Sequence, residues 1–511
     1  MLYNGLSLEK KEKKNMQTNK YIIGIDIGTT STKAVLFDEK GTLIKQTNVE
    51  YPLYHDQPDM AEQEPEEIFQ AVVENLKEVS SGVENIAAVS FSSAMHSLIL
   101  LDKDKNPLTR SMTWADNRAK KYAQELKNSQ LGQEIYQATG TPIHSMAPLS
   151  KIIWLREEKP ELFAKVAWFI GIKEYVFYRL FDELKMDQSV ASATGMFNIH
   201  EKKWDNKALA TAGITEEKLP QVVLTSYQFR NLQVDVGLTK DTPFVVGATD
   251  GVLSNLGVNA MEKGSLALTI GTSGALRTVS KEPILDSTGR TFCYLLDEEF
   301  YVSGGAVNNG GIIFRWLRDT LYDGKVDYTQ ALEFAKNVPA GAKGLLFLPY
   351  LNGERAPLWN ENARGSYFGL SQSHTKEDML RAGLEGILFN LYQVYELLAI
   401  SEAKAIQATG GFTRAPFLCQ MIADIFNQPV SVPASVESSC LGAAVVAMKS
   451  LGMIDDLTHI ENMVGVHHTY QPNPENAVIY QKLYPLFASL SKNLAEEYEK
   501  IASLQVLLSK G

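Results

Sequence analysis

The sequence predicts an α/β protein made of two similar halves, each built around a β-sheet that opens with a hairpin. The first observation is the segment 21–41, YIIGIDIGTTSTKAVLFDEKG, in which two apolar strands flank a Gly-Thr turn. The second is the segment 265–280, SLALTIGTSGALRTVS, which repeats this pattern about half the chain later. The third is that no low-complexity linker separates the halves. We therefore expect two lobes joined by close crossovers.

The tip of the first hairpin has the composition of a phosphate-binding turn. Gly28 lacks a Cβ, so an anion can approach its backbone closely, and the backbone N–H groups that follow can form an anion-binding concavity. Asp26, at the end of the first strand, can hold a hydrated Mg²⁺ against bound phosphates. The side-chain donors near the tip are three hydroxyls and an ammonium group: Thr29, Thr30, Ser31 and Lys33. The other interpretation is an ordinary hairpin, with Asp26 as a turn cap and Lys33 solvated beside the strand.

The second hairpin carries the same turn, since Gly271 and Thr272 follow its first strand as Gly28 and Thr29 follow the earlier one. Two such tips, one in each half, favour a duplicated domain that holds a nucleotide in the cleft between the halves. A chance match between two Gly-Thr turns is the alternative. The strand pattern on both sides of each turn weakens that alternative.

The segments after each hairpin predict further strands and helices. A third strand over 48–54, a helix over 64–79 and a buried strand over 85–94 indicate a ribonuclease-H-like sheet. The segments expected to form a strand, a turn and a helix are 243–259, 301–319 and 405–427. The other expected helices cover 151–156, 161–168, 173–180, 377–400, 438–450 and 475–508.

These elements divide the chain into an N-terminal domain over 20–259 and a C-terminal domain over 260–511. Residues 1–19 are rich in Lys and Glu and lack the apolar centre of a secretory signal. We expect them to form a disordered extension, with Met16 as an alternative start of the protein.

Composition excludes several classes of partner. Of the 511 residues, 45% are hydrophobic and 21% are charged, which is typical of a folded soluble protein. The net charge of −11 argues against a general nucleic-acid or anionic-membrane surface, and no apolar run is long enough for a membrane span. Three cysteines without metal-like spacing indicate a reducing compartment, so we expect a cytoplasmic protein.

Other phosphate-binding motifs are missing from the sequence. There is no Gly-x-x-x-x-Gly-Lys-[Ser/Thr] P-loop, no Gly-x-Gly of a dinucleotide or protein-kinase loop, and no His-Glu-x-x-His. The two-lobed nucleotide site of the actin-like proteins is the solution that remains.

Several blocks resemble the FGGY carbohydrate kinases, which share the fold of the actin-like ATPase superfamily. They are IDIGTTSTKAVLF, VVGATDGVLSNLG, LTIGTSGA and GERAPLWNENARGSYFGL, with ATGGFTRAPF resembling the adenosine-binding turn of the family. The resemblance extends from Tyr21 to the C-terminal helix. It implies two ribonuclease-H-like domains with an interdomain cleft for ATP and sugar, a requirement for Mg²⁺, and compatibility with a homodimer.

Within the family, other blocks resemble the members that phosphorylate gluconate: SFSSAMHSLILLD, TWADNRA, GTPIHSMAPLSKIIWL, ASATGMFN and ATDGVLSNLGVN. The resemblance implies ATP-dependent conversion of D-gluconate to 6-phospho-D-gluconate. Xylulose or another polyol is the alternative acceptor. An actin-like ATPase that does not act on sugars, or a catalytically inactive regulator, is the alternative of another class.

The reaction implied by the resemblance needs a carboxylate to take a proton from an alcohol, a contribution of about 10²–10⁴-fold in rate. Asp250 lies between an apolar strand and a helix, and it matches the catalytic Asp of the family. From the residues alone, Asp250 could equally cap that helix.

The resemblance also implies the remaining contacts. Thr29, Thr30, Ser31 and Thr272 form the expected phosphate clamp. Gly311, Gly410 and Gly411 are expected beside adenosine, although each could serve only a tight turn. The expected sugar contacts are Met95, His96, Trp114, Asp116 and Arg118. The partner of the substrate carboxylate stays open among Arg118, Lys151 and His144.

Overall fold

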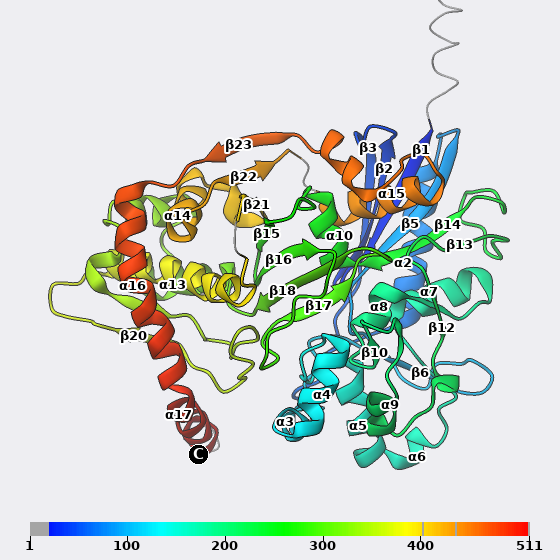
Figure 1. Cartoon of the computed structure of the whole chain (residues 1–511), viewed down its shortest axis with the longest axis horizontal. Coiled ribbons are helices and arrows are strands. Elements are labelled where there is room, and N and C mark those ends of the chain that lie inside the picture. The colour runs from blue at the N-terminus through cyan, green and yellow to red at the C-terminus, as the bar shows by residue number, and fades with distance from the viewer. Residues whose placement is uncertain (1–19, 401–402, 435–436, 509–511) are drawn as a thin grey trace, which may run out of the picture.

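The computed structural model describes residues 20–400, 403–434 and 437–508, and the expectation for residues 1–19 lies outside them. The described chain forms two lobes, each centred on a mixed β-sheet with helices packed against it (Figure 1). The first sheet has six strands and the second has seven.

The first sheet brings the ends of three parallel strands to one edge. Its strand order is β13-β14-β5-β1-β2-β3, with β5 parallel to both β1 and β14. Each of these three strands therefore delivers the residues that follow it to the cleft side of the lobe. The strands are β1 (Tyr21–Ile27), β2 (Ser31–Asp38), β3 (Leu43–Glu50), β5 (Ile86–Ser93), β13 (Gln228–Phe229) and β14 (Phe244–Thr249).

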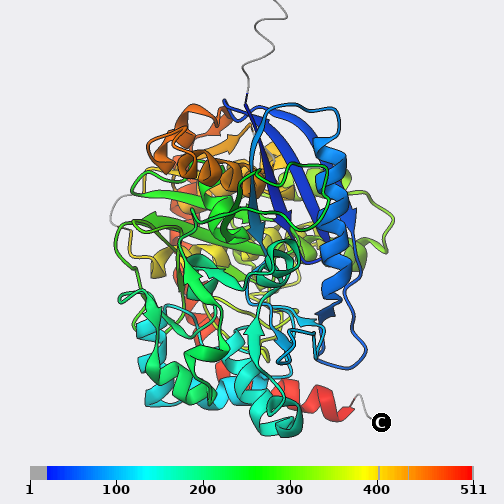
Figure 2. The same cartoon turned by 90° about the vertical axis from the view of Figure 1, so that its right-hand side faces the viewer.

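The strands β1, β5 and β14 read as near-continuous apolar runs because helices cover both faces of the sheet. One face packs against α2 (Pro65–Ser80) and α7 (Ile172–Phe181), and α15 (Ser438–Ser450) lies on the other. Figure 2 shows α2 running along the sheet on the side away from α15.

The second sheet repeats the opening hairpin of the first. Its order is β17-β18-β16-β15-β21-β22-β23, and β15 pairs antiparallel with β16 and parallel with β21. The strands are β15 (Ser265–Ile270), β16 (Gly274–Ser280), β17 (Phe292–Leu295), β18 (Tyr301–Val307), β21 (Ala405–Thr409), β22 (Val430–Pro433) and β23 (Val466–Tyr470).

The helix α15 comes from the second half of the sequence but packs on the first sheet and on α10 (Asp250–Gly257). Three glycines make this approach possible. A Cβ on Gly24 would lie 2.0 Å from the Cys440 carbonyl oxygen, and one on Gly442 would lie 2.2 Å from that of Leu253. A Cβ on Gly257 would likewise lie 1.8 Å from the Ser438 carbonyl oxygen. The sequence division at residue 259 thus separates the sheets, whereas α15 crosses back between the lobes.

The other helices follow the chain around the two sheets. They are α3 (Lys120–Lys127), α4 (Gln130–Thr139), α5 (Pro148–Glu158), α6 (Pro160–Phe163), α8 (Gln188–Ser192), α9 (Asn206–Ala212), α11 (Gly311–Tyr322), α12 (Tyr328–Lys336), α13 (Lys376–Leu397), α14 (Pro416–Phe426), α16 (Pro474–Asn493) and α17 (Ala495–Leu508). Four 3₁₀ turns are η1 (Glu216–Lys218), η2 (Ala342–Gly344), η3 (Gly411–Arg414) and η4 (Leu457–Asn462).

Short strand pairs complete the described chain: β4 (Glu62–Gln63) with β7 (Ser111–Met112), β6 (Ile99–Leu101) with β8 (Trp168–Ile170), β9 (Lys185–Asp187) with β12 (Gln221–Val223), β10 (Phe197–Asn198) with β11 (Lys203–Trp204), and β19 (Leu346–Leu348) with β20 (Ser366–Phe368). No helix among the described residues is both long and apolar enough to cross a membrane.

Three expected elements differ from the structure. The third strand lies at Leu43–Glu50 rather than 48–54, because Pro52 has no N–H to donate to a ladder. The helix expected over 161–168 ends at Phe163, since the apolar residues from Trp168 pair with β6 instead. The terminal helix is two helices that break at Leu494.

Candidate active site

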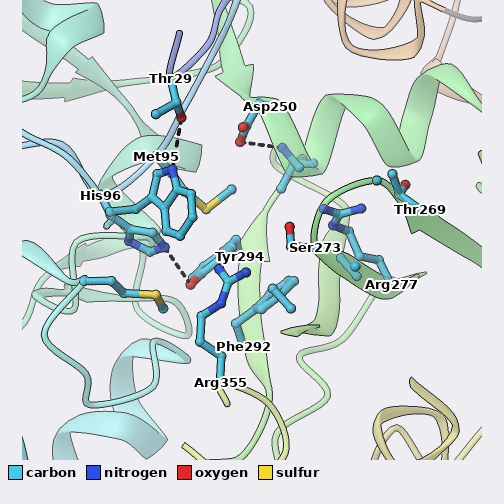
Figure 3. Close-up of a pocket in the computed structure, with 18 of the residues that line it drawn as sticks. Thr29, Met95, His96, Asp250, Thr269, Ser273, Arg277, Phe292, Tyr294 and Arg355 are labelled. Carbon is cyan, nitrogen blue, oxygen red and sulfur yellow. Dashed lines mark hydrogen bonds between the residues drawn. The ribbon is translucent and has the colours of Figure 1, made fainter. Parts of the chain in front are cut away.

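A cavity of about 330 Å³ lies between the lobes, and both hairpin tips contribute to its wall. Thr29 comes from the first tip, and Gly271 comes from the second. Figure 3 shows side chains from the two lobes facing one another across this space. The two Gly-Thr turns, which are far apart in the sequence, are therefore neighbours in space.

Asp250 lies at the cavity wall, where β14 passes into α10. Thr249 occupies the N-cap position of α10, and Asp250 is the first residue of the helix. The Gly251 N–H donates to Asp250 Oδ1 at 2.7 Å. Burial, and then the negative charge of Asp26, raise the pKa of Asp250 to about 6. A carboxylate with this pKa is ionised at neutral pH and is a stronger base than an exposed Asp.

Asp26 lies near the end of β1, close enough to Asp250 for its charge to raise the pKa of Asp250. Its Oδ1 accepts a hydrogen bond from the Ser92 hydroxyl at 2.7 Å, and its Oδ2 accepts one from Ser439 at 2.9 Å. Burial raises the pKa of Asp26 despite these hydrogen bonds. The described residues hold no group of three or more His, Cys, Asp or Glu side chains arranged for a metal. Two neighbouring carboxylates nevertheless fit Mg²⁺, which usually binds one or two carboxylates, phosphate oxygens and water.

The first tip is held in place by side chains from other segments. The Trp114 indole N–H donates to Thr29 Oγ1 at 3.0 Å, and the Gln63 amide donates to the Thr29 carbonyl at 2.7 Å. Lys33 forms an ion pair of 2.7 Å with Glu437, at the entrance to α15. Thr30 is exposed and Ser31 is half-buried.

The second tip is built from backbone contacts. The Gly311 N–H at the start of α11 donates to the Gly271 carbonyl at 2.7 Å. Gly410, with a φ of +89°, follows β21 so closely that a Cβ would lie 2.4 Å from the Ile270 carbonyl oxygen. Thr272, Gly410 and Gly411 are exposed. The structure thus gathers the glycines expected to contact nucleotide around one turn.

Three of the residues expected to contact sugar line the cavity: Met95, His96 and Trp114. His96 has a backbone φ of +68°, a conformation that residues other than glycine rarely adopt and that is often found at functional sites. Its Nδ1 lies 2.7 Å from the Ala193 carbonyl oxygen, which fixes the proton on that nitrogen. Burial lowers the pKa of His96 to about 3, so its Nε2 is a neutral acceptor, and the Tyr294 hydroxyl lies 3.4 Å from it (Figure 3).

The other expected sugar contacts lie outside the cavity wall. Arg118 donates from Nε to Asp116 at 3.0 Å and pairs with Glu62. Lys151 is fully buried and donates to the carbonyl oxygens of His96 and Thr113, both at 2.7 Å. It therefore ties the two segments that carry Met95 and Trp114. His144 lies in a neighbouring hollow, 3.4 Å from Glu361.

The structure adds wall residues that the sequence reasoning did not select: Arg277 on β16, Tyr294 on β17 and Arg355. Arg355 lies inside the GERAPLWN block quoted above, and Arg277 follows the second tip on an otherwise apolar and small-residue strand. An arginine in such a strand is a signal that could have been used.

The site combines three features: two lobes whose sheets each open with a hairpin, one cavity lined by both Gly-Thr tips, and a carboxylate at a strand end. These features define an enzyme that transfers phosphoryl groups to a small acceptor, on the fold of the actin-like ATPases. The models of the FGGY family of carbohydrate kinases match residues 21–257 with the N-terminal domain and residues 266–451 with the C-terminal domain. The chain belongs to this family. It is an α/β carbohydrate kinase, a phosphotransferase with an alcohol group as acceptor and ATP as donor, which confirms the expected fold and enzyme class.

The chain is similar over nearly its whole length to several known proteins. It is 49% identical to a gluconokinase of Bacillus licheniformis, over 96% of this chain and 99% of the relative. A crystal structure of a gluconate kinase from Lactobacillus acidophilus superposes with a TM-score of 0.92 at 42% identity, over 95% of this chain and 100% of that one. A ligand-bound structure described as a xylulose kinase from the same organism also gives 0.92 and 42%, over 94% and 100%.

Proposed function

We propose that this enzyme transfers the γ-phosphoryl group of ATP to the 6-hydroxyl of D-gluconate, giving 6-phospho-D-gluconate and ADP. The observation that carries the proposal is the 49% identity to the gluconokinase of Bacillus licheniformis over nearly the full length of both chains. The cavity supports it, because a wall that combines a carboxylate with arginines suits an acceptor with a hydroxyl at one end and an acid group at the other.

In this proposal Asp250 is the general base. It takes the proton of the acceptor hydroxyl as the oxygen attacks the γ-phosphorus. The Nε2 of His96 accepts a hydrogen bond from another hydroxyl of the acceptor, which replaces the 3.4 Å contact with the Tyr294 hydroxyl. Met95 and Trp114 supply apolar surface beside the carbon chain. Asp116 and Arg118, which pair with each other outside the wall, support the loop that carries Trp114 rather than contact the acceptor.

The nucleotide lies across both tips. We assign its phosphates to Gly28, Thr29, Thr30 and Ser31 on one side and to Gly271 and Thr272 on the other. Adenosine then lies against Gly311, Gly410 and Gly411. Lys33 is paired with Glu437, so it reaches a phosphate only by exchanging that partner. Asp26 would hold Mg²⁺, and the ion would supply positive charge that neutralises the transferred group.

In this proposal residues 20–259 supply the general base, the hydroxyl contacts and one side of the phosphate site, whereas residues 260–511 supply the adenosine surface and the other side of the phosphate site. The expected division into a sugar and phosphate domain and an adenine nucleotide domain is therefore kept only in part. We also place the enzyme in the cytoplasm, since its three cysteines are free and buried. A homodimer is compatible with the proposal.

Xylulose is the second candidate acceptor, because one of the two similar solved structures is described as a xylulose kinase. A coupled assay of ADP formation decides between the two. D-gluconate, D-xylulose, D-ribulose and glycerol are compared with a reaction that lacks sugar. We expect kcat/KM for gluconate to exceed the others at least tenfold, with 6-phosphogluconate identified by its dehydrogenase. A preference for xylulose, or ATP hydrolysis independent of sugar, would contradict the proposal.

A further inference from the structure

One charged side chain in the cavity has no partner among the described residues. Arg277 lines the wall from β16, and no hydrogen bond or ion pair to its guanidinium is found there. Its Nη1 is enclosed and unpaired. Asp250 attracts Arg277 electrostatically, but the two side chains do not form an ion pair.

An enclosed and unpaired N–H group of a guanidinium is costly, because burial removes the water that would otherwise accept its hydrogen bonds. An anion that binds to such a group replaces the hydrogen bonds that water would make. A planar carboxylate matches the guanidinium fork with two parallel hydrogen bonds. The unpaired Nη1 of Arg277 in the cavity wall therefore points to an acidic ligand.

The second arginine of the wall is already occupied. Arg355 donates from Nε to Asn308 Oδ1 at 2.7 Å and from Nη2 to the Val307 carbonyl at 3.2 Å. Its guanidinium also lies 5.0 Å from the centre of the Trp114 ring. Arg355 therefore contacts both lobes, and it has fewer free N–H donors than Arg277.

The cavity also has opposite charges on different walls. Asp250 belongs to the first lobe and Arg277 to the second, and both line the cavity (Figure 3). The Arg277 guanidinium lies beside Gly251, where an added Cβ would be 3.3 Å from its Nε, without forming an ion pair with Asp250. A sugar acid cannot place its carboxylate against Asp250 without like-charge repulsion. It can place a hydroxyl there and its acid group at the guanidinium.

We propose that Arg277 binds the carboxylate of the substrate and sets the preference for a sugar acid over a neutral polyol. This inference rests on the proposed function and names the residue that gives the same site its specificity. None of the three residues left open from the sequence, Arg118, Lys151 and His144, lines this cavity.

The test measures binding apart from turnover. Calorimetry gives the Kd of D-gluconate without ATP, and separately the Kd of a non-hydrolysable ATP analogue, for the wild type and for Arg277→Gln. Truncating one partner of a buried charge pair weakens binding strongly, so we expect the gluconate Kd to rise about 10²-fold while the analogue Kd stays within twofold. Arg277→Lys keeps the charge but loses the guanidinium fork, so its gluconate Kd should lie between those of the wild type and Arg277→Gln.

Two further variants serve as controls. Arg230→Gln makes the same exchange at an exposed position and should bind gluconate as the wild type does. Arg355→Gln should weaken D-gluconate and the neutral polyol D-glucitol by similar factors, whereas Arg277→Gln should weaken gluconate alone. Glucitol is measured as a competitive inhibitor of gluconate phosphorylation. Melting temperatures confirm that each variant is folded, and Arg277→Lys carries the test if Arg277→Gln is not.

The outcomes separate the two proposals. A wild type that does not bind gluconate contradicts the proposed function. A wild type that binds it, with an Arg277→Gln variant whose gluconate Kd is unchanged, overturns the role of Arg277. Equal weakening of gluconate and glucitol, or weakened binding of the ATP analogue, also overturns it, because Arg277 would then serve the cavity wall or the phosphates.

Discussion

The two hairpins share a Gly-Thr turn, yet their surroundings differ in kind. Around the first tip, polar and charged side chains make the contacts: Asp26 accepts from two serine hydroxyls and Lys33 pairs with Glu437. Around the second tip no charged side chain of the described residues makes the contacts. They are backbone hydrogen bonds, such as the 2.7 Å bond from Gly311 to Gly271, and threonine hydroxyl contacts, such as the 3.0 Å contact between Thr269 and Thr409. The same turn thus belongs to an electrostatic site on one side and to a close-fitting backbone surface on the other.

This difference suggests that the first side supplies proton transfer and charge, and that the second side supplies a close-fitting surface. The carboxylates proposed to change protonation and to hold a metal, Asp26 and Asp250, are on the first side. Groups that exclude water and fit a flat ring belong on the side of Gly311 and Gly410. Substitutions on the first side should therefore reduce turnover, and those on the second should reduce nucleotide affinity and stability.

The largest effect is expected for Asp250→Asn. The amide keeps the shape of the side chain but cannot accept the hydroxyl proton, so kcat with gluconate should fall by about 10²–10⁴-fold. Binding of a non-hydrolysable ATP analogue should stay close to that of the wild type. Because the folded state raises the pKa of Asp250, its ionised form destabilises the protein above pH 6, and the variant should melt at the same or a higher temperature.

The control for this variant is Asp241→Asn, which makes the same exchange at an exposed residue. Its kcat should equal that of the wild type. An Asp250→Asn variant with normal turnover would show that another group is the base, and the contrast between the two sides of the cavity would lose its main support.

The sheets and the positions of the two tips could be predicted from the sequence because their signals are local. The apolar runs, the Gly-Thr turns and the small residues of α15 are each complete within one short segment, and the helix expected over 438–450 matches α15 at both ends. The position of Asp250 at a strand end followed from the same kind of signal.

The partners of charged side chains could not be predicted in this way, because they come from distant segments. Arg118 is close in sequence to Trp114, which lines the cavity, but Glu62 and Asp116 hold its guanidinium outside it. Lys151 resembles a candidate anion ligand in the sequence, yet its ammonium group is used by backbone carbonyls of two loops. Only the assembled fold shows that Arg277, among the arginines of the cavity wall, has an enclosed guanidinium nitrogen without a partner in the described residues.

A smaller effect is expected on the second side, from a pair of neighbouring glycines. Gly410→Ala places a methyl group 2.4 Å from the Ile270 carbonyl oxygen at a φ of +89°, so the free energy of unfolding should fall by about 1–3 kcal/mol. Gly411→Ala meets no atom within 4 Å and should leave unfolding unchanged. Its methyl group should still raise KM for ATP, because it enters the surface assigned to adenosine.

Denaturant unfolding and KM for ATP, measured on both variants, separate these effects. A Gly411→Ala enzyme with an unchanged KM would remove adenosine from this turn. A Gly410→Ala enzyme as stable as the wild type would show that the second tip is not the tightly fitted surface described above.

The smallest effect is a pH dependence that comes from the first side alone. Asp250 has a pKa of about 6, and only its ionised form can accept a proton. The value of kcat/KM for gluconate should therefore be flat above pH 7, fall to about half at pH 6, and fall about tenfold by pH 5. The terminal phosphate of ATP also titrates near pH 6, so the residual activity of Asp250→Asn is measured in parallel. Its profile keeps any decline that comes from the phosphate and should lack the decline that comes from Asp250. Asp26→Asn removes a charge that raises the pKa of Asp250, and its midpoint should move to lower pH. A profile that stays flat to pH 5 would show that Asp250 is not the titrating base. An unchanged midpoint in Asp26→Asn would show that Asp26 does not raise the pKa of Asp250.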